Sequence, residues 1–430
     1  MDLRTAEFDV VVVGAGPGGM AAAAVAAETG LAVCLLDDNP SPGGQIWRGY
    51  RAETAKKWPH GQVFLDWIER LERSGCEVWS GSQVVGRPAA NMLRLQRGDG
   101  ECDVAYESLI VATGARERFL PFPGWTLPGV MGAGGLQALV KSGLDPRGKR
   151  VVLAGSGPLL LAVAANLQLA GARVQGVFEQ APLARLLPFS FQLLGQPSKL
   201  VEGLRYRVQT FSAPYRTGTW VAKAEGRGRV EHVTLSDGRR QWSVDCDWLG
   251  CGFHLVPNLE LPRLLGCEIA DGFVTVDDSR QSSVANVACI GELTGIGGVE
   301  KAMIEGQIAG LAAAGRDAEP FRAKLQGQMR FVRGMRDAFA LRAELREFAT
   351  PDTVVCRCED VPLAALQSCK DGREAKLHTR CGMGACQGRI CGAATEFLFG
   401  WKNAGVRPPV FPANVSTIAA SVEDGESSVR

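Results

Sequence analysis

The sequence is poor in the side chains on which acid–base catalysis most often depends. Its 430 residues include only four histidines, and none stands in a motif with a nucleophile or a carboxylate. Because imidazole is the commonest acid–base group in enzymes, we expect no catalytic residue in this chain. No Cys-x-x-Cys or Cys-x-x-x-x-Cys couple lies beside the first glycine-rich loop, which argues against a disulfide reductase.

An excess of one charge and an uninterrupted apolar run are also missing. The chain has 47 Lys+Arg and 46 Asp+Glu, a net charge of +1, so we expect no nucleic-acid partner. The apolar stretch 8–27 is broken by four glycines and Pro17, which argues against a membrane span. The opening residues lack the basic-then-apolar order of a signal peptide, so we expect a cytoplasmic protein.

Glycine, in contrast, is abundant, with 53 residues. Some of them mark a β-α-β unit near the start of the chain. Residues 8–13 form an apolar β-branched run typical of a buried parallel strand. The loop 14–19 follows, then an alanine-rich helix over about 20–29 and a strand over 32–36. A glycine-rich loop between such a strand and helix predicts a dinucleotide site.

Each chemical role of such a loop can be assigned to a residue of this unit. Gly14 would make the tight turn, Gly16 would let the backbone approach a pyrophosphate, and Gly19 would let helix and strand pack closely. Asp37 lies 23 residues after Gly14 and would accept hydrogen bonds from ribose hydroxyls.

A second unit of the same kind begins 141 residues later. A strand over 150–154 leads to Gly155-Ser-Gly157, and a strand over 174–178 ends at Glu179. Leu160 replaces the third glycine, and we expect it to push the helix from the strand or to fill the mouth of the pocket. Whether this second site binds a nucleotide stays open.

These patterns predict an α/β protein with two Rossmann-like dinucleotide-binding domains, the second inserted in the first, and a small C-terminal domain. The runs 109–114 and 286–292 fit further strands of the first domain. The predicted boundaries are 1–115 with 253–320 for the first domain, 116–252 for the insert, 321–348 for a basic helical linker, and 349–430 for the C-terminal domain.

Thirteen cysteines are present, and six of them lie between Cys356 and Cys391. Without an export signal a disulfide framework is not expected, whereas thiolates among glycines suit an iron–sulfur cluster. Zinc is the main rival, but zinc sites usually space paired cysteines by about two to four residues, and Cys-x-Cys is tighter. Spacing does not choose four ligands from the five candidates, which are Cys356, Cys358, Cys381, Cys386 and Cys391.

The glycine motifs resemble flavoproteins with two dinucleotide-binding domains. The resemblance rests on loop 14–19, the turn Gly43-Gly44-Gln45, Ala112-Thr113-Gly114 and Gly291-Glu292, where the family usually has Gly-Asp. It implies FAD in the first site, although NAD or ATP takes this place in some relatives. The implied cofactor-binding residues are Gly14, Gly16, Gly19, Asp37, Gly44, Gln45, Thr113, Gly114 and Glu292.

The cysteine-rich region resembles the [2Fe-2S] domain of the bacterioferritin-associated ferredoxin type. The run Thr379–Cys391 also resembles one in anaerobic glycerol-3-phosphate dehydrogenase, where the position of Cys381 is not a cysteine. The resemblance therefore implies that Cys381 is a spare. It implies as cluster ligands Cys356, Cys358, Cys386 and Cys391.

The order of motifs, including Pro123–Gly129 and Arg407-Pro-Pro, is similar to the alpha (A) subunits of multi-subunit flavin dehydrogenases. These include D-hydroxyproline dehydrogenase, octopine and nopaline oxidases, and hydrogen cyanide synthase. The resemblance implies a beta subunit with its own FAD that oxidises an amine or amino acid, in some members a small gamma subunit, and an FMN at the interface with the beta subunit. It also implies a downstream electron acceptor, which could bring the complex to a membrane.

Two alternatives stay open. The chain could be a self-contained NAD(P)H-dependent flavin and iron–sulfur oxidoreductase that binds the nicotinamide nucleotide at Gly155–Glu179. It could also be a zinc-stabilised interaction module without catalytic function.

Overall fold

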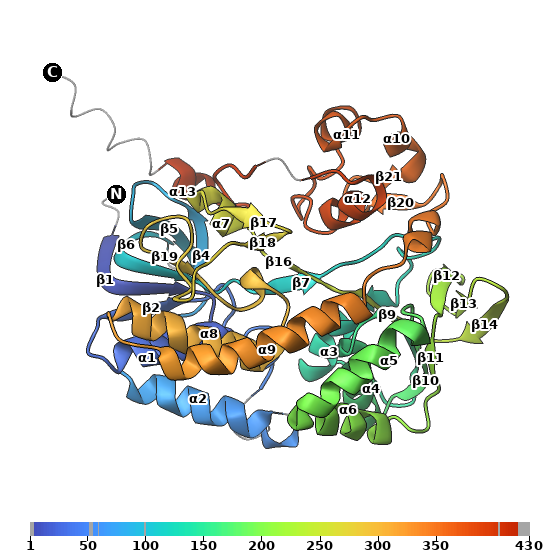
Figure 1. Ribbon diagram of the computed structural model, residues 1–430. Coiled ribbons are helices and arrows are strands. Elements are labelled where there is room, and N and C mark those ends of the chain that lie inside the picture. Colours follow the sequence, from blue (N-terminus) through green and yellow to red (C-terminus); the bar gives the residue numbers. More distant parts are fainter. Residues whose placement is uncertain (1–3, 51–54, 59, 99, 403–404, 420–430) are drawn as a thin grey trace. The chain divides into compact units, whose positions relative to one another are not determined.

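The computed structural model describes residues 4–50, 55–58, 60–98, 100–402 and 405–419. The chain divides into two compact units, and Figure 1 traces both. Unit 1 contains the residues up to 116, residues 257–332 and the residues from 405 onward, whereas unit 2 contains residues 117–256 and 333–404. Two short strands carry the chain across the boundary between the units, β7 (Ala115–Glu117) and β16 (Leu255–Pro257).

Unit 1 is built on a seven-stranded sheet in the order β3-β2-β1-β6-β5-β4, with β19 paired to the end of β6. Strands β3, β2, β1, β6 and β19 are parallel, and β5 and β4 are antiparallel. The strands are β1 (Arg4–Val13), β2 (Val33–Leu36), β3 (Glu77–Trp79), β4 (Gln83–Gly86), β5 (Met92–Arg97), β6 (Gly100–Val111) and β19 (Val287–Cys289). The remaining elements are α1 (Pro17–Ala27), α2 (Gly61–Arg73), α7 (Glu260–Leu265), β17 (Ile269–Ala270), β18 (Phe273–Val274), α8 (Gly298–Ala313) and α13 (Val415–Ala419). Helix α9 (Glu319–Ala338) begins in unit 1 and continues into unit 2 after Val332.

The sheet of unit 1 is buried on both faces, as its valine-rich first strand predicts. Val10 and Val12 face the core that contains α1 and α8, while Val11 and Val13 face the core that contains α7. Figure 1 shows α1 and α8 side by side. Their backbones approach closely, because a Cβ added to Gly306 of α8 would overlap the carbonyl oxygen of Gly18 in α1. The alanine-rich helix is thus buried on all sides.

Unit 2 contains a five-stranded parallel sheet in the order β11-β10-β9-β15-β8. Helices α3 and α4 pack on one face, and the antiparallel sheet β12-β13-β14 packs on the other. The strands are β8 (Val130–Gly132), β9 (Arg150–Ser156), β10 (Arg173–Glu179), β11 (Tyr215–Thr217), β12 (Trp220–Glu225), β13 (His232–Ser236), β14 (Gln241–Asp245) and β15 (Trp248–Phe253). The helices are α3 (Ala133–Lys141), α4 (Leu159–Leu169), α5 (Leu183–Gln192) and α6 (Pro197–Gln209).

The prediction of a helical stretch to Phe348 is wrong beyond Ala338. There α9 ends, residues 339–342 are not helical, and a short 3₁₀ turn occupies Ala343–Glu347. The helix stops because tertiary contacts hold the next residues in another conformation, as described below. Within the described residues, no helix combines the length and the apolar character that crossing a membrane requires.

We call residues 349–402 the cysteine segment. Its small core contains Val355, Leu366 and Ala375 together with three cysteines. The Trp125 indole donates a hydrogen bond to the Val354 carbonyl at 2.5 Å, which joins the segment to the rest of unit 2. The elements of the segment are β20 (Val354–Cys356), β21 (Val361–Pro362), α10 (Leu363–Gln367), α11 (Gly372–Thr379) and α12 (Cys391–Phe399).

Candidate functional site

Two glycines of the first loop stand where no side chain fits. Gly14 has a φ of 107°, in the region that favours glycine, and a Cβ there would overlap the carbonyl oxygen of Ala112. A Cβ on Gly19 would overlap the carbonyl oxygen of Gly14. These two positions allow α1 to begin directly beside the end of β1.

Gly16, between them, faces open space. Its φ of −74° suits any residue, and an added Cβ would meet only the Cα of Gly44, 4.0 Å away. Helix α1 starts at Pro17 without a side-chain cap and without an acidic residue in its first turn. Because free amides and the helix dipole at such an end favour negative charge, this cradle fits a pyrophosphate.

Asp37 lies beside the loop at the end of β2. Its carboxylate accepts hydrogen bonds from the Ala15 amide at 2.5 Å and from the backbone and side-chain amides of Asn39, both at 2.7 Å, and the residue is 6% exposed. A carboxylate has about four acceptor positions, so about one position is left that suits a ribose hydroxyl.

The other predicted cofactor-binding residues of unit 1 follow strands that end at the same edge of the sheet. The turn at Gly44 packs on the loop, since a Cβ there would lie 2.8 Å from the Cα of Gly16, while Gln45 is exposed. Thr113 and Gly114 follow β6, and Glu292 follows β19, which pairs in parallel with the last residues of β6. The carboxyl ends of parallel strands are where nucleotides bind in this kind of sheet.

Glu292 is engaged with backbone amides in this structure. Its carboxylate accepts hydrogen bonds from Gly297 at 3.1 Å and Gly298 at 2.8 Å, at the start of α8. Burial raises the pKa of Glu292 above its ordinary value. The side chain therefore folds back onto the first residues of α8.

A buried ion cluster that the sequence analysis missed clamps the turn before α8. The Lys301 ammonium donates to the Gly291 carbonyl at 2.6 Å and to Glu305 at 2.9 Å, and Glu305 accepts from the Gly291 amide at 2.7 Å. Arg280 pairs with the second oxygen of Glu305 at 3.1 Å. Lys301 and Glu305 are 0% exposed. Their spacing of four residues was the available signal, but it is also typical of surface helix pairs.

The second glycine loop repeats part of this arrangement. The Glu179 carboxylate accepts hydrogen bonds from Gly157 at 2.7 Å and Ala181 at 2.8 Å, and burial raises its pKa to about 7. Of the two expectations for Leu160, the one that it fills the pocket mouth is wrong: its side chain is 1% exposed and packs in the core between the sheet and helices α3 and α4.

The cysteine segment brings five sulfur atoms together. The sulfurs of Cys356, Cys381 and Cys391 lie within 4.8 Å of one another and all three residues are buried. Cys358 and Cys386 form a second pair through a side-chain hydrogen bond. The residue that the resemblance treats as a spare, Cys381, thus lies within 4.8 Å of two predicted ligands, Cys356 and Cys391.

Backbone amides point toward these sulfurs. Burial opposes ionisation of Cys386, but hydrogen bonds from the Ile390 amide and the Cys358 thiol outweigh it and lower the pKa of Cys386. The Cys381 sulfur and burial together raise the pKa of Cys391. Burial also raises the pKa of Cys356, although the Gly382 amide works against it. Amides directed at sulfur stabilise metal-bound thiolates, so this donor set fits a thiolate-held metal centre.

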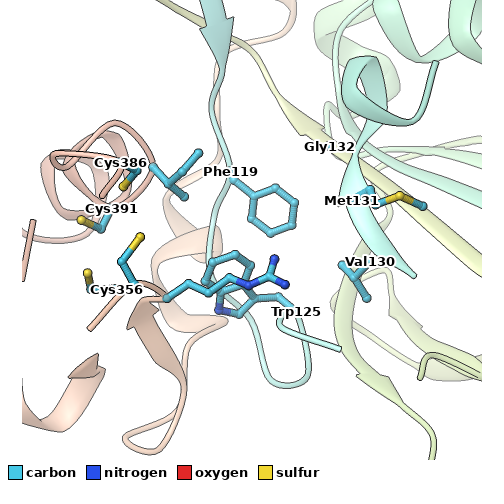
Figure 2. Close-up of a pocket in the computed structure, with 11 residues that line it drawn as sticks. Phe119, Trp125, Val130, Met131, Gly132, Cys356, Cys386 and Cys391 are labelled. Carbon is cyan, nitrogen blue, oxygen red and sulfur yellow. The ribbon is translucent and has the colours of Figure 1, made fainter. Parts of the chain in front are cut away.

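The four predicted cluster ligands line one cavity of about 420 Å³ in unit 2. Figure 2 shows Cys356, Cys386 and Cys391 on one side, with Phe119 and Trp125 between them and the strand β8. The aromatic rings were not predicted as site residues, although Trp125 belongs to the motif Pro123–Gly129. The remaining lining residues are Val130, Met131, Gly132, Arg357, Cys358 and Ile390.

Comparisons with known proteins agree with the fold. The family described as pyridine nucleotide-disulphide oxidoreductase matches residues 8–316. The chain is 35% identical to hydrogen cyanide synthase subunit HcnB of Pseudomonas aeruginosa, over 89% of this chain and 90% of that relative. It is 33% identical to the opine oxidase A subunit of Rhizobium meliloti, over 97% of this chain and 99% of that relative. L-Proline dehydrogenase from P. horikoshii has a similar fold, with a TM-score of 0.70 at 18% identity over 97% of this chain and 80% of that one.

These matches confirm two predictions from the sequence. The chain has the α/β fold of FAD- and NAD-binding oxidoreductases. Its resemblance to subunits of multi-subunit flavin oxidoreductases is confirmed over nearly the full chain.

Proposed function

The chain belongs to the pyridine nucleotide-disulphide oxidoreductase family, and from this premise we propose that it is the electron-transfer alpha subunit of a heteromeric flavin-dependent dehydrogenase or oxidase. Its complex would oxidise an amine or amino acid at a CH–NH or CH–NH₂ group, within a beta subunit that carries its own FAD. Two relatives named as subunits, of hydrogen cyanide synthase and opine oxidase, support this proposal.

The observation that carries the proposal is the group of cysteine sulfurs in unit 2. In our proposal Cys356, Cys358, Cys386 and Cys391 hold a [2Fe-2S] cluster, with Cys381 adjacent. The amides of Gly388, Arg389 and Ile390 hydrogen-bond to the Cys386 sulfur and would balance negative charge there. Zinc would also accept thiolates, but the Cys-x-Cys pair is tighter than zinc sites usually are.

In unit 1, the cradle around Gly16 would hold the pyrophosphate of a dinucleotide, and Asp37 its ribose. We propose FAD for this site; NAD and ATP present the same phosphate and ribose groups. An FMN at the interface with the beta subunit completes the cofactor set that the family implies.

When bound, a flavin divides a two-electron transfer into single steps and an iron–sulfur cluster carries one electron at a time. The residues of this chain bind and shield these groups. Phe119 and Trp125 line the cavity beside the cysteines and would exclude water, which lowers the local dielectric constant and strengthens the amide–sulfur hydrogen bonds.

The test is a metal and sulfide analysis of the protein co-purified with its partner, together with an electron paramagnetic resonance spectrum after dithionite reduction. We expect about two iron and two sulfide per chain. Cys386→Ser should remove the iron and its visible absorbance but leave the nucleotide bound.

The matched control is Cys369→Ser. Cys369 lies in the same segment, and its thiol donates to the Ala365 carbonyl at 3.6 Å instead of facing the other sulfurs, so this variant should keep the cluster. Zinc without iron or sulfide in the wild-type protein would refute the proposal and favour an interaction module. A cluster that survives Cys386→Ser would refute the ligand assignment.

A further inference from the structure

The second dinucleotide crevice is not an open site, because a segment of the chain itself lies in it. Three polar residues stand at the carboxyl ends of neighbouring parallel strands: Ser156 ends β9, Gln180 follows β10 and His254 follows β15. In a sheet of this type, that edge is where a dinucleotide binds.

All three side chains bind one backbone oxygen, the carbonyl of Phe339. Ser156 donates to it at 2.8 Å, the His254 Nε2 contacts it at 2.5 Å, and Gln180 donates at 3.4 Å. Ser156 and Gln180 are 4% and 0% exposed. Burial lowers the pKa of His254. Because a carbonyl oxygen can only accept, the ring must carry a proton on Nε2 to donate to it.

The contacts continue along the next residues. The Gln180 side chain also donates to the Ala340 carbonyl at 3.4 Å and accepts from the Arg342 amide at 3.1 Å. Arg185 donates to the Ala340 carbonyl at 3.2 Å. One glutamine amide therefore binds three polar groups of the segment, which explains why α9 stops at Ala338.

The apolar part of the segment covers the position expected for the ribose. The Phe339 side chain is 5% exposed and meets the Phe189 ring edge-on at 5.6 Å. Ala338 and Phe339 pack on Ala181, two residues after Glu179, and Glu179 itself is 0% exposed. The carboxylate that would accept ribose hydroxyls is thus sealed from solvent.

We infer that residues 339–342 occupy the second dinucleotide crevice as a built-in ligand, so that this crevice binds no nicotinamide nucleotide. The positioning residues for this segment, which leads into the cysteine segment, are Ser156, Gln180 and His254. A crevice that suits a nucleotide in this type of fold holds a peptide here. The electrons that this chain carries then do not come from NAD(P)H at that crevice. The inference does not depend on the metal content of the cysteine segment.

The first test measures nucleotide binding. The full chain carrying Gly16→Val, so that the first site cannot contribute, is titrated with NADH and with NADPH by fluorescence under anaerobic conditions. We expect no saturable binding up to millimolar concentrations. Saturable binding of one nucleotide per chain would overturn the inference, whatever the iron analysis gives.

The second test asks whether the three anchors hold the segment. Gln180→Ala should speed hydrogen exchange of the amides in 339–345 about tenfold, as expected for losing a buried hydrogen-bonded anchor. Gln168→Ala is the matched control, because Gln168 lies on α4 and its amide bonds only the exposed Ser212 hydroxyl among the contacts described. Equal exchange in the two variants would refute the positioning role, and Ser156→Ala provides the same test with a smaller change should Gln180→Ala fail to fold.

Discussion

Replacing Gly16 by valine should empty the nucleotide site of unit 1 without unfolding the unit. The backbone at this position is extended, and an added Cβ would meet only Gly44, at 4.0 Å. The free energy of unfolding of the nucleotide-free protein should therefore change by no more than about 1 kcal/mol, with a small gain from the lost freedom of glycine in the unfolded chain. The same side chain would stand where a pyrophosphate must approach the backbone.

The size of the expected effect follows from the stabilisation that a bound nucleotide gives to the folded protein. At a free concentration of about one hundred times its dissociation constant, a ligand stabilises the folded state by about 2.7 kcal/mol. For a unit of this size that corresponds to roughly 5–10 °C in melting temperature. The wild-type protein should gain this increment on addition of its nucleotide, and Gly16→Val should not.

The assay combines thermal melting with and without nucleotide and mass spectrometry of the nucleotide released on denaturation, which also distinguishes FAD from NAD and ATP. Gly19→Ala provides the contrast, because its Cβ would overlap the Gly14 carbonyl; we expect it to destabilise even the nucleotide-free protein, by on the order of 3 kcal/mol. If Gly16→Val retains stoichiometric nucleotide with the wild-type melting increment, the placement of the pyrophosphate is refuted.

Two further predictions concern the cysteine segment and the second loop. Since Cys381 lies within 4.8 Å of Cys391, the Cys391→Ser variant should keep part of its iron by using Cys381 as a ligand. The double variant that also carries Cys381→Ser should lose this iron. An equal iron content in the single and double variants would contradict the prediction. Burial raises the pKa of Glu179 from 4.5 to about 7. Between these pH values the folded protein binds a proton that the unfolded chain does not, so the free energy of unfolding should fall as the pH rises through this window. Denaturant unfolding across pH 4.5–7 should show this decline, and Glu179→Gln should flatten it; a decline of the same slope in that variant would rule out Glu179 as its source.

The local patterns that the sequence displays translate directly into the fold. The valine run of β1, the glycine loop and the alanine-rich α1 follow each other as predicted, because residues within about thirty positions of one another make the unit, and strand and helix periodicity specify it. The second loop at Gly155 and its flanking strands were predictable for the same reason.

The parts of the site that depend on contacts between distant residues were not predictable from the sequence. Nothing in the sequence near Leu160 indicates that its side chain packs in one core with Ala133 and Trp248, which lie on other elements. The pair Lys301 and Glu305 resembles an ordinary surface pair until Arg280 and the Gly291 turn enclose it.

An α/β protein with dinucleotide-type glycine loops and a cysteine-rich segment was predictable from the sequence alone, because helix and strand periods, glycine loops and cysteine clusters are local patterns. The end of α9, the segment that lies in the second crevice and the grouping of the sulfurs depend on contacts between distant residues. The helical period of 321–348 continues past Ala338, yet the Phe339 carbonyl accepts hydrogen bonds from three strand ends that lie 85 to 183 residues away in the chain. Buried hydrogen bonds outweigh the weak preference of a few residues for helix, and partners so far apart leave no periodic trace in the sequence.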